Sequence, residues 1–161
     1  EYSFLAIIQA LEAYHRATGS GNYMKQKDYA PVQSALVTAI PDFVQPDHKT
    51  ALKSRIQYGY EYSLRKRMEL ILESVPSKLA SEITTGASDF IQRVVVTRNY
   101  LTHRDESQKA LVFEKRDMFN AMIRLRMLVE FLLLREAGLN DDLLATTMTT
   151  HWTYKNRPRM L

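Results

Sequence analysis

The sequence contains no cysteine, and its 161 residues include only five glycines, five prolines and one tryptophan. Without cysteine the chain can form neither a disulfide nor a thiolate metal site, so its composition does not mark it as secreted. No signal peptide precedes Tyr2, and no apolar run reaches the roughly 18 residues that a bilayer-spanning helix needs. These absences lead us to expect a cytoplasmic protein.

The charge balance favours an anionic partner without specifying which one. The chain has 22 Lys+Arg against 18 Asp+Glu, a net charge of +4 at pH 7. Its length and its 45% of hydrophobic residues fit one domain over residues 1–161. Because an apolar helical pattern is already under way at Phe4 and Leu5, we expect this domain to be cut from a longer protein.

Few glycines, few β-branched clusters and long stretches of three- and four-residue apolar spacing predict an all-α fold. Pro76 and Gly138 are predicted to end helices, and Asn140 to start a short one. We predict helices over residues 2–17, 32–40, 47–75, 89–103 and 114–137, with a weaker segment at 78–83. Asp47 or Thr50 can cap the third of these helices, and Ser88 or Asp89 the fourth.

A short polar motif, Arg98-Asn99-Tyr100-Leu101-Thr102-His103, is predicted at the C-terminal end of a helix. An imidazole can move the proton of a ribose hydroxyl while a guanidinium neutralises charge on the phosphate. Positions four apart share a helix face, so Asn99 can orient His103. One histidine cannot easily serve as base and acid at once, so we expect a symmetric dimer to supply a second copy.

The residues of this motif resemble the hallmark of the HEPN family: an arginine, a polar residue, three or more variable residues and a histidine at a helix end. The similarity is closest to the ApeA-like HEPN group and extends through Phe4-Leu5, the segment 9–16 and the segment 132–139. The resemblance implies a helical bundle that dimerises across the motif helices. It also implies metal-independent endoribonuclease activity in a defence or toxin system, with Arg98 and His103 catalytic and Asn99 supporting. In ApeA-like proteins this domain forms the C-terminal part of an antiphage protein, so an N-terminal sensor domain is implied as well.

Further basic residues could contact RNA. We predict that Arg104 and the run Arg65-Lys66-Arg67 bind phosphates, although such a run is more often only a solvated helix face. Tyr58, Tyr60 and Tyr62 could stack bases beside that run.

Glu12 and His15 are three residues apart and could form half of a metal site. No second Glu-x-x-His exists, so we expect neither a metal nor another cofactor, and Glu12 paired with Arg16 is the favoured alternative. We expect Glu12, His15 and Tyr100 to line the cleft around the motif.

Two alternatives to a ribonuclease stay open at this point. The chain could be a non-catalytic helical module that dimerises or docks a partner, with the motif as a polar interface. A nucleotide-binding module is the other, although no glycine-rich phosphate loop supports it. The basic aromatic tail, residues 143–161, could pack on the bundle, reach a partner domain or touch RNA.

Overall fold

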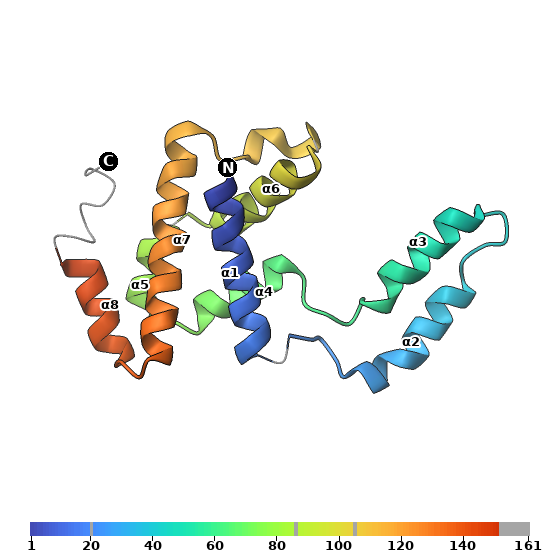
Figure 1. Cartoon of the computed structure of the whole chain (residues 1–161), viewed down its shortest axis with the longest axis horizontal. Coiled ribbons are helices and arrows are strands. Elements are labelled where there is room, and N and C mark those ends of the chain that lie inside the picture. Colours follow the sequence, from blue (N-terminus) through green and yellow to red (C-terminus); the bar gives the residue numbers. More distant parts are fainter. Residues whose placement is uncertain (20, 86, 105, 152–161) are drawn as a thin grey trace. The chain divides into compact units, whose positions relative to one another are not determined.

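The computed structural model of the chain describes residues 1–19, 21–85, 87–104 and 106–151. Over these residues it is all-α, as predicted, and its only β feature is an isolated bridge between Asn22 and Glu61 (Figure 1). Its helices are α1 (Tyr2–Thr18), α2 (Gln26–Thr38), α3 (Pro46–Gln57), α4 (Leu64–Glu73), α5 (Ser77–Thr84), α6 (Phe90–His103), the 3₁₀ segment η1 (Glu106–Leu111), α7 (Lys115–Glu136) and α8 (Asp141–Thr150).

The described chain packs as two compact units. The larger unit comprises residues 1–18 and the described residues from 64 onward, and the smaller comprises residues 19–63. The smaller unit contains the helices α2 and α3. Among the described residues of these two helices, Tyr29 is the one that is buried. The assignment of residues 1–161 to one domain stays a prediction.

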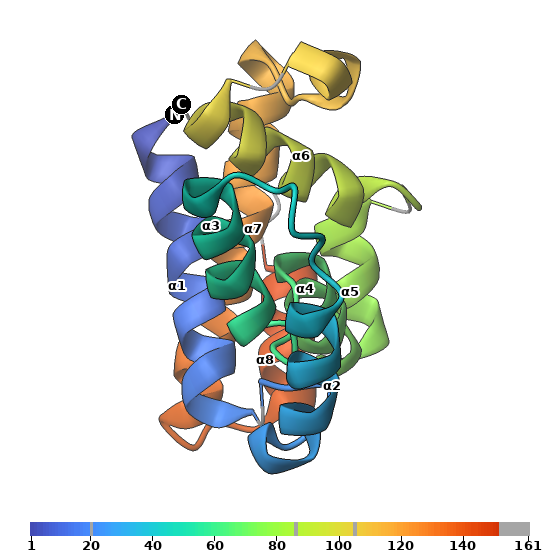
Figure 2. The ribbon, with the colours of Figure 1, turned by 90° about the vertical axis from the view of Figure 1, so that its right-hand side faces the viewer.

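The core of the larger unit takes residues from α1, α4, α5, α6, α7 and α8, and α1 and α7 pack against each other within it (Figure 2). Both helices carry apolar residues at three- and four-residue steps, which places those side chains on one face. Burying each large apolar side chain stabilises the fold by about 2 kcal/mol. The buried residues of these two helices include Phe4, Ile8, Leu11, Leu125, Leu128, Phe131 and Leu132.

The helix α6 packs against α1, α4 and η1 (Figure 2). Phe90 and Val94 anchor it in the core, and its polar C-terminal turn extends to the surface. The core therefore fixes the direction of α6, and with it the position of the predicted motif.

Several predicted helix ends are confirmed. Gly138 follows α7 with a φ of 90°, the left-handed conformation that glycine adopts most readily. The side chain of Asn140 accepts a hydrogen bond from the backbone N–H of Leu143 at 3.0 Å and so caps α8. Asp89 precedes α6 as expected, but its side chain makes no capping hydrogen bond.

The predicted long helix over residues 47–75 is wrong, because residues 58–63 separate α3 from α4. The Tyr29 hydroxyl donates to the Ile56 carbonyl at 2.6 Å, and a Cβ at Gly59 would collide with that hydroxyl. Backbone hydrogen bonds then join residues 21–23 to residues 60–62, which draws the chain out of the helix. The second helix also starts earlier than predicted, at Gln26.

Candidate active site

The motif occupies the last turn and a half of α6, as predicted. The backbone N–H of Arg104 donates to the Tyr100 carbonyl at 2.8 Å, and Arg104 then turns into the left-handed region with a φ of 55°. This conformation costs a non-glycine residue about 1–2 kcal/mol, and it ends the helix directly after His103. The imidazole of His103 is consequently presented at an exposed helix terminus.

Arg98 and Asn99 are joined by a hydrogen bond in which Nη1 of Arg98 donates to Oδ1 of Asn99 at 3.2 Å. No hydrogen bond joins Asn99 to His103 among the described residues, so the expectation that Asn99 orients His103 stays a prediction. His103 itself is exposed, and its side chain has no hydrogen-bond partner among the described residues. The Arg98 guanidinium thus has one side-chain partner, whereas the His103 imidazole is available to an external group.

Tyr100 connects the motif to η1. Its hydroxyl donates to Oε1 of Glu106 at 3.3 Å, and the Arg104 guanidinium lies 5.6 Å from its ring centroid. Lys109 forms an ion pair with Glu106 at 2.9 Å. This hydrogen-bonded pairing lowers the pKa of the Glu106 carboxyl and raises the pKa of the Lys109 ammonium. Tyr100 thus lies among charged groups at the end of α6, and its place in a cleft around the motif stays a prediction.

The run Arg65-Lys66-Arg67 does not form one basic face. Consecutive helix residues point about 100° apart, so three of them cannot share a direction. Arg65 is exposed and lines a hollow together with Asn99 and Tyr100. Arg67 is 1% exposed, and its Nη1 lies 3.4 Å from Nδ1 of His15. The prediction that Arg67 contacts RNA is wrong, because its guanidinium is buried in the core.

The surroundings of His15 favour its neutral form. A guanidinium can only donate, so Nδ1 of His15 accepts from Arg67 and the ring proton resides on Nε2. Burial lowers the pKa of His15, and the positive charges of Arg67 and Arg16 lower it further. His15 is therefore one of the acceptors available to a buried arginine.

Glu12 forms the favoured ion pair with Arg16, at 3.8 Å. Arg104 instead contacts Glu1, just before the start of α1, at 3.9 Å. Glu12 and His15 are more than about 15 Å further along that helix. Within one chain the structure does not bring them to Arg104, and their place in a shared cleft stays a prediction.

Other predicted features bear less directly on the site. Tyr58, Tyr60 and Tyr62 belong to the smaller unit. Of the tail, residues 143–150 belong to α8, which buries Leu144 and Met148, whereas residues 152–161 lie outside the described residues.

Among the residues that the structure describes, no three His, Asp or Glu side chains gather as metal ligands. None of the helices so described has the length and apolar character required to cross a membrane.

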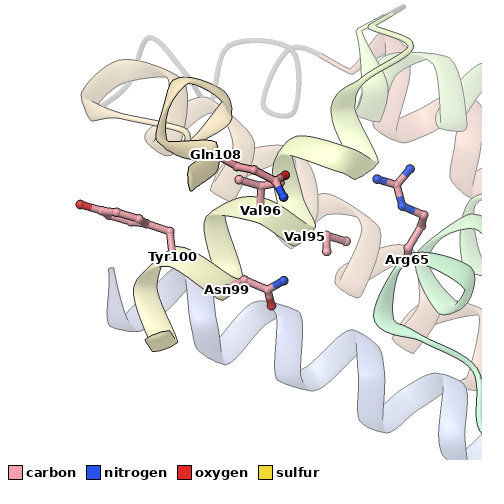
Figure 3. A pocket seen from close by; sticks show the side chains of 6 residues that line it. All are labelled: Arg65, Val95, Val96, Asn99, Tyr100 and Gln108. Carbon is pink, nitrogen blue, oxygen red and sulfur yellow. The ribbon is translucent and has the colours of Figure 1, made fainter. Parts of the chain in front are cut away.

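Three residues outside the predicted motif also lie around Asn99. Val95, Val96 and Gln108 line the same hollow as Arg65 (Figure 3). Gln108 lies in η1 at a backbone kink, with φ −121° and ψ 22°. A glutamine in a kinked segment carries no periodic signal, so the sequence offered nothing by which to find it.

The fold and the motif define an all-α protein that carries an arginine, an asparagine and an exposed histidine at the end of one helix. A family model described as Apea-like HEPN matches residues 5–143, a span that includes the smaller unit, most of the larger unit and the whole motif. Neither the curated proteins nor the solved structures yield a significant match. The chain belongs to the Apea-like HEPN family.

Proposed function

We propose that this protein is a metal-independent endoribonuclease whose active site is completed by a second copy of the chain. The proposal is carried by one observation: the last turns of α6 carry a hydrogen-bonded Arg98–Asn99 pair and an exposed His103 that has no hydrogen-bond partner within the described chain. Membership of the Apea-like HEPN family supports an RNase-type activity in a defence or toxin system.

The chemistry needs two proton transfers. One His103 imidazole, in its neutral form, accepts the proton of a ribose 2′-hydroxyl, and the 2′-oxygen attacks the adjacent phosphorus. A second imidazole, in its protonated form, donates its proton to the 5′-oxygen as the bond from phosphorus to that oxygen breaks. The products are a 2′,3′-cyclic phosphate and a 5′-hydroxyl.

Arg98 stabilises the charge that accumulates on the phosphoryl oxygens during attack. A guanidinium binds two such oxygens through parallel N–H donors, and this interaction is strongest when the group is already oriented. The hydrogen bond to Asn99 provides that orientation, because it restrains a side chain that would otherwise sample many rotamers. We assign Asn99 a supporting role for this reason.

The two imidazoles come from two chains. A two-fold axis beside the end of α6 would place one His103 and one Arg98 from each copy around a single phosphate. The exposed Arg104 and the half-buried Lys66 would then supply contacts to flanking phosphates.

The test is cleavage of single-stranded RNA by the purified chain in EDTA, with the product ends analysed for 2′,3′-cyclic phosphate. His103→Ala should lower the rate by about 10²–10⁴-fold, the usual contribution of a general acid or base. His48→Ala is the matched control, because His48 is also exposed on a helix, in α3.

Equal rates for His103→Ala and the unmodified chain would refute the assignment. If the unmodified chain leaves RNA intact, the non-catalytic alternative gains support. Arg98→Ala should in that case weaken self-association.

A further inference from the structure

A hollow of about 180 Å³ opens directly beside the motif. Its lining residues come from three segments: Arg65 from α4, Gln108 from η1, and Val95, Val96, Asn99 and Tyr100 from α6 (Figure 3). Val96 is buried and Val95 is half-buried, whereas Arg65, Asn99 and Gln108 are exposed. The hollow therefore has an apolar floor and a polar rim, the arrangement that suits a flat heteroaromatic ring.

The walls of the hollow are held in place by contacts across α6. The backbone N–H of Phe113 donates to Oγ1 of the buried Thr97 at 2.9 Å, and Nε of Arg93 donates to the Leu111 carbonyl at 3.3 Å. At the other end of η1, the Tyr100 hydroxyl binds Glu106. These contacts join η1 and the residues that follow it to α6 on both sides of Gln108, which lines the hollow.

The rim presents mainly hydrogen-bond donors. The guanidinium of Arg65 can only donate, and the Asn99 amide adds two N–H donors, while one of the two acceptor positions on its Oδ1 is already taken by Arg98. In Figure 3 the nitrogen of that amide points toward Val95, and the Tyr100 ring points away from the other lining residues. Gln108 adds one donor group and one acceptor.

Resting on the proposed function, we propose that this hollow binds an unpaired nucleobase next to the cleaved phosphate and prefers the keto bases, guanine and uracil. Asn99 belongs to the hollow and to the hydrogen-bonded pair with Arg98, so a base bound there is adjacent to a phosphate held by Arg98. Keto bases present carbonyl acceptors to donors, whereas adenine and cytosine present an amino group at the corresponding position. Single-stranded RNA exposes these edges for recognition.

The preference is tested with labelled 2′-O-methyl oligonucleotides that contain a single unmodified ribose, so that cleavage is confined to one phosphate. Each of the four bases is placed in turn on either side of that phosphate. Guanine or uracil on one side should raise the cleavage rate roughly tenfold over adenine and cytosine. Arg65→Ala and Gln108→Ala should flatten this ratio. Arg126→Ala, which removes an exposed arginine of α7 outside the hollow, should preserve it.

Cleavage without base preference, or a preference that survives in both Arg65→Ala and Gln108→Ala, would overturn the inference while leaving the ribonuclease assignment intact. If no cleavage occurs, the ribonuclease assignment fails. Fluorescence anisotropy of the same oligonucleotides with the His103→Ala chain then tests whether the hollow binds keto bases. A roughly tenfold tighter binding of the keto series, lost in the His103→Ala/Arg65→Ala double variant, would uphold the base site. Equal affinities for all four series would refute it.

Discussion

Replacing Thr97 by valine tests how the segment after η1 is attached to the motif helix. Thr97 is 0% exposed, and its Oγ1 accepts the backbone N–H of Phe113, a residue only 5% exposed. Valine has nearly the same shape but no acceptor. The Phe113 N–H would remain buried without its partner, a loss that costs about 1–3 kcal/mol.

Part of this cost is offset, because a methyl group replaces a hydroxyl in an apolar surrounding, a gain of up to about 0.8 kcal/mol. We therefore expect Thr97→Val to lower the free energy of unfolding by about 1–2 kcal/mol in urea denaturation. Thr97→Ser is the matched control, since it keeps the hydroxyl and loses one methyl group, at a cost of about 1 kcal/mol.

Stability alone separates these two variants poorly, so hydrogen exchange of the Phe113 amide is the decisive measurement. The amide should lose protection in Thr97→Val and keep most of it in Thr97→Ser, because only the hydroxyl engages that N–H. Unchanged stability together with unchanged protection in Thr97→Val would refute the reasoning.

Two further predictions concern charge and backbone conformation. The pKa of His15 lies below its unfolded value of 6.5, so its contribution to stability is complete above that pH and is lost as the pH falls through the folded value. The neutral variant His15→Gln should consequently lose less stability than the unmodified chain between about pH 7.5 and about pH 5 in urea titrations, and equal losses would contradict this. Gly138→Ala should lower the free energy of unfolding by about 1 kcal/mol, because nothing within 4 Å would obstruct a Cβ and only the positive φ opposes it. Gly138→Asn should recover part of that loss in thermal unfolding, and an unchanged melting temperature for Gly138→Ala would count against the backbone argument.

Local sequence signals predicted the parts of the fold that depend on local physics. The apolar spacing of α7, the glycine after it and the Asn140 cap all act within a few residues, and each is found as expected. The motif was also found at the end of α6, since the loss of apolar spacing after Leu101 marks that end. The Apea-like HEPN family match agrees with the resemblance read from the motif and its flanking helices.

The features that escaped prediction depend on residues far apart in the chain. The basic neighbours of Arg67 predict an exposed side chain. Its hydrogen-bond partner His15, however, lies 52 residues away on α1. The break between α3 and α4 similarly depends on Tyr29, which closes over Gly59 from another helix. Such partners become visible only after packing, so no local pattern could predict them.

The central claim is that two copies of His103 serve one active site. Mixing unmodified chains with His103→Ala chains, allowing subunits to exchange, and measuring RNA cleavage in EDTA tests it directly. If each site needs both imidazoles, the rate should fall with the square of the fraction of unmodified chains, because mixed dimers are inactive. A rate proportional to that fraction, or a complete absence of cleavage by the unmodified chain, would contradict the account.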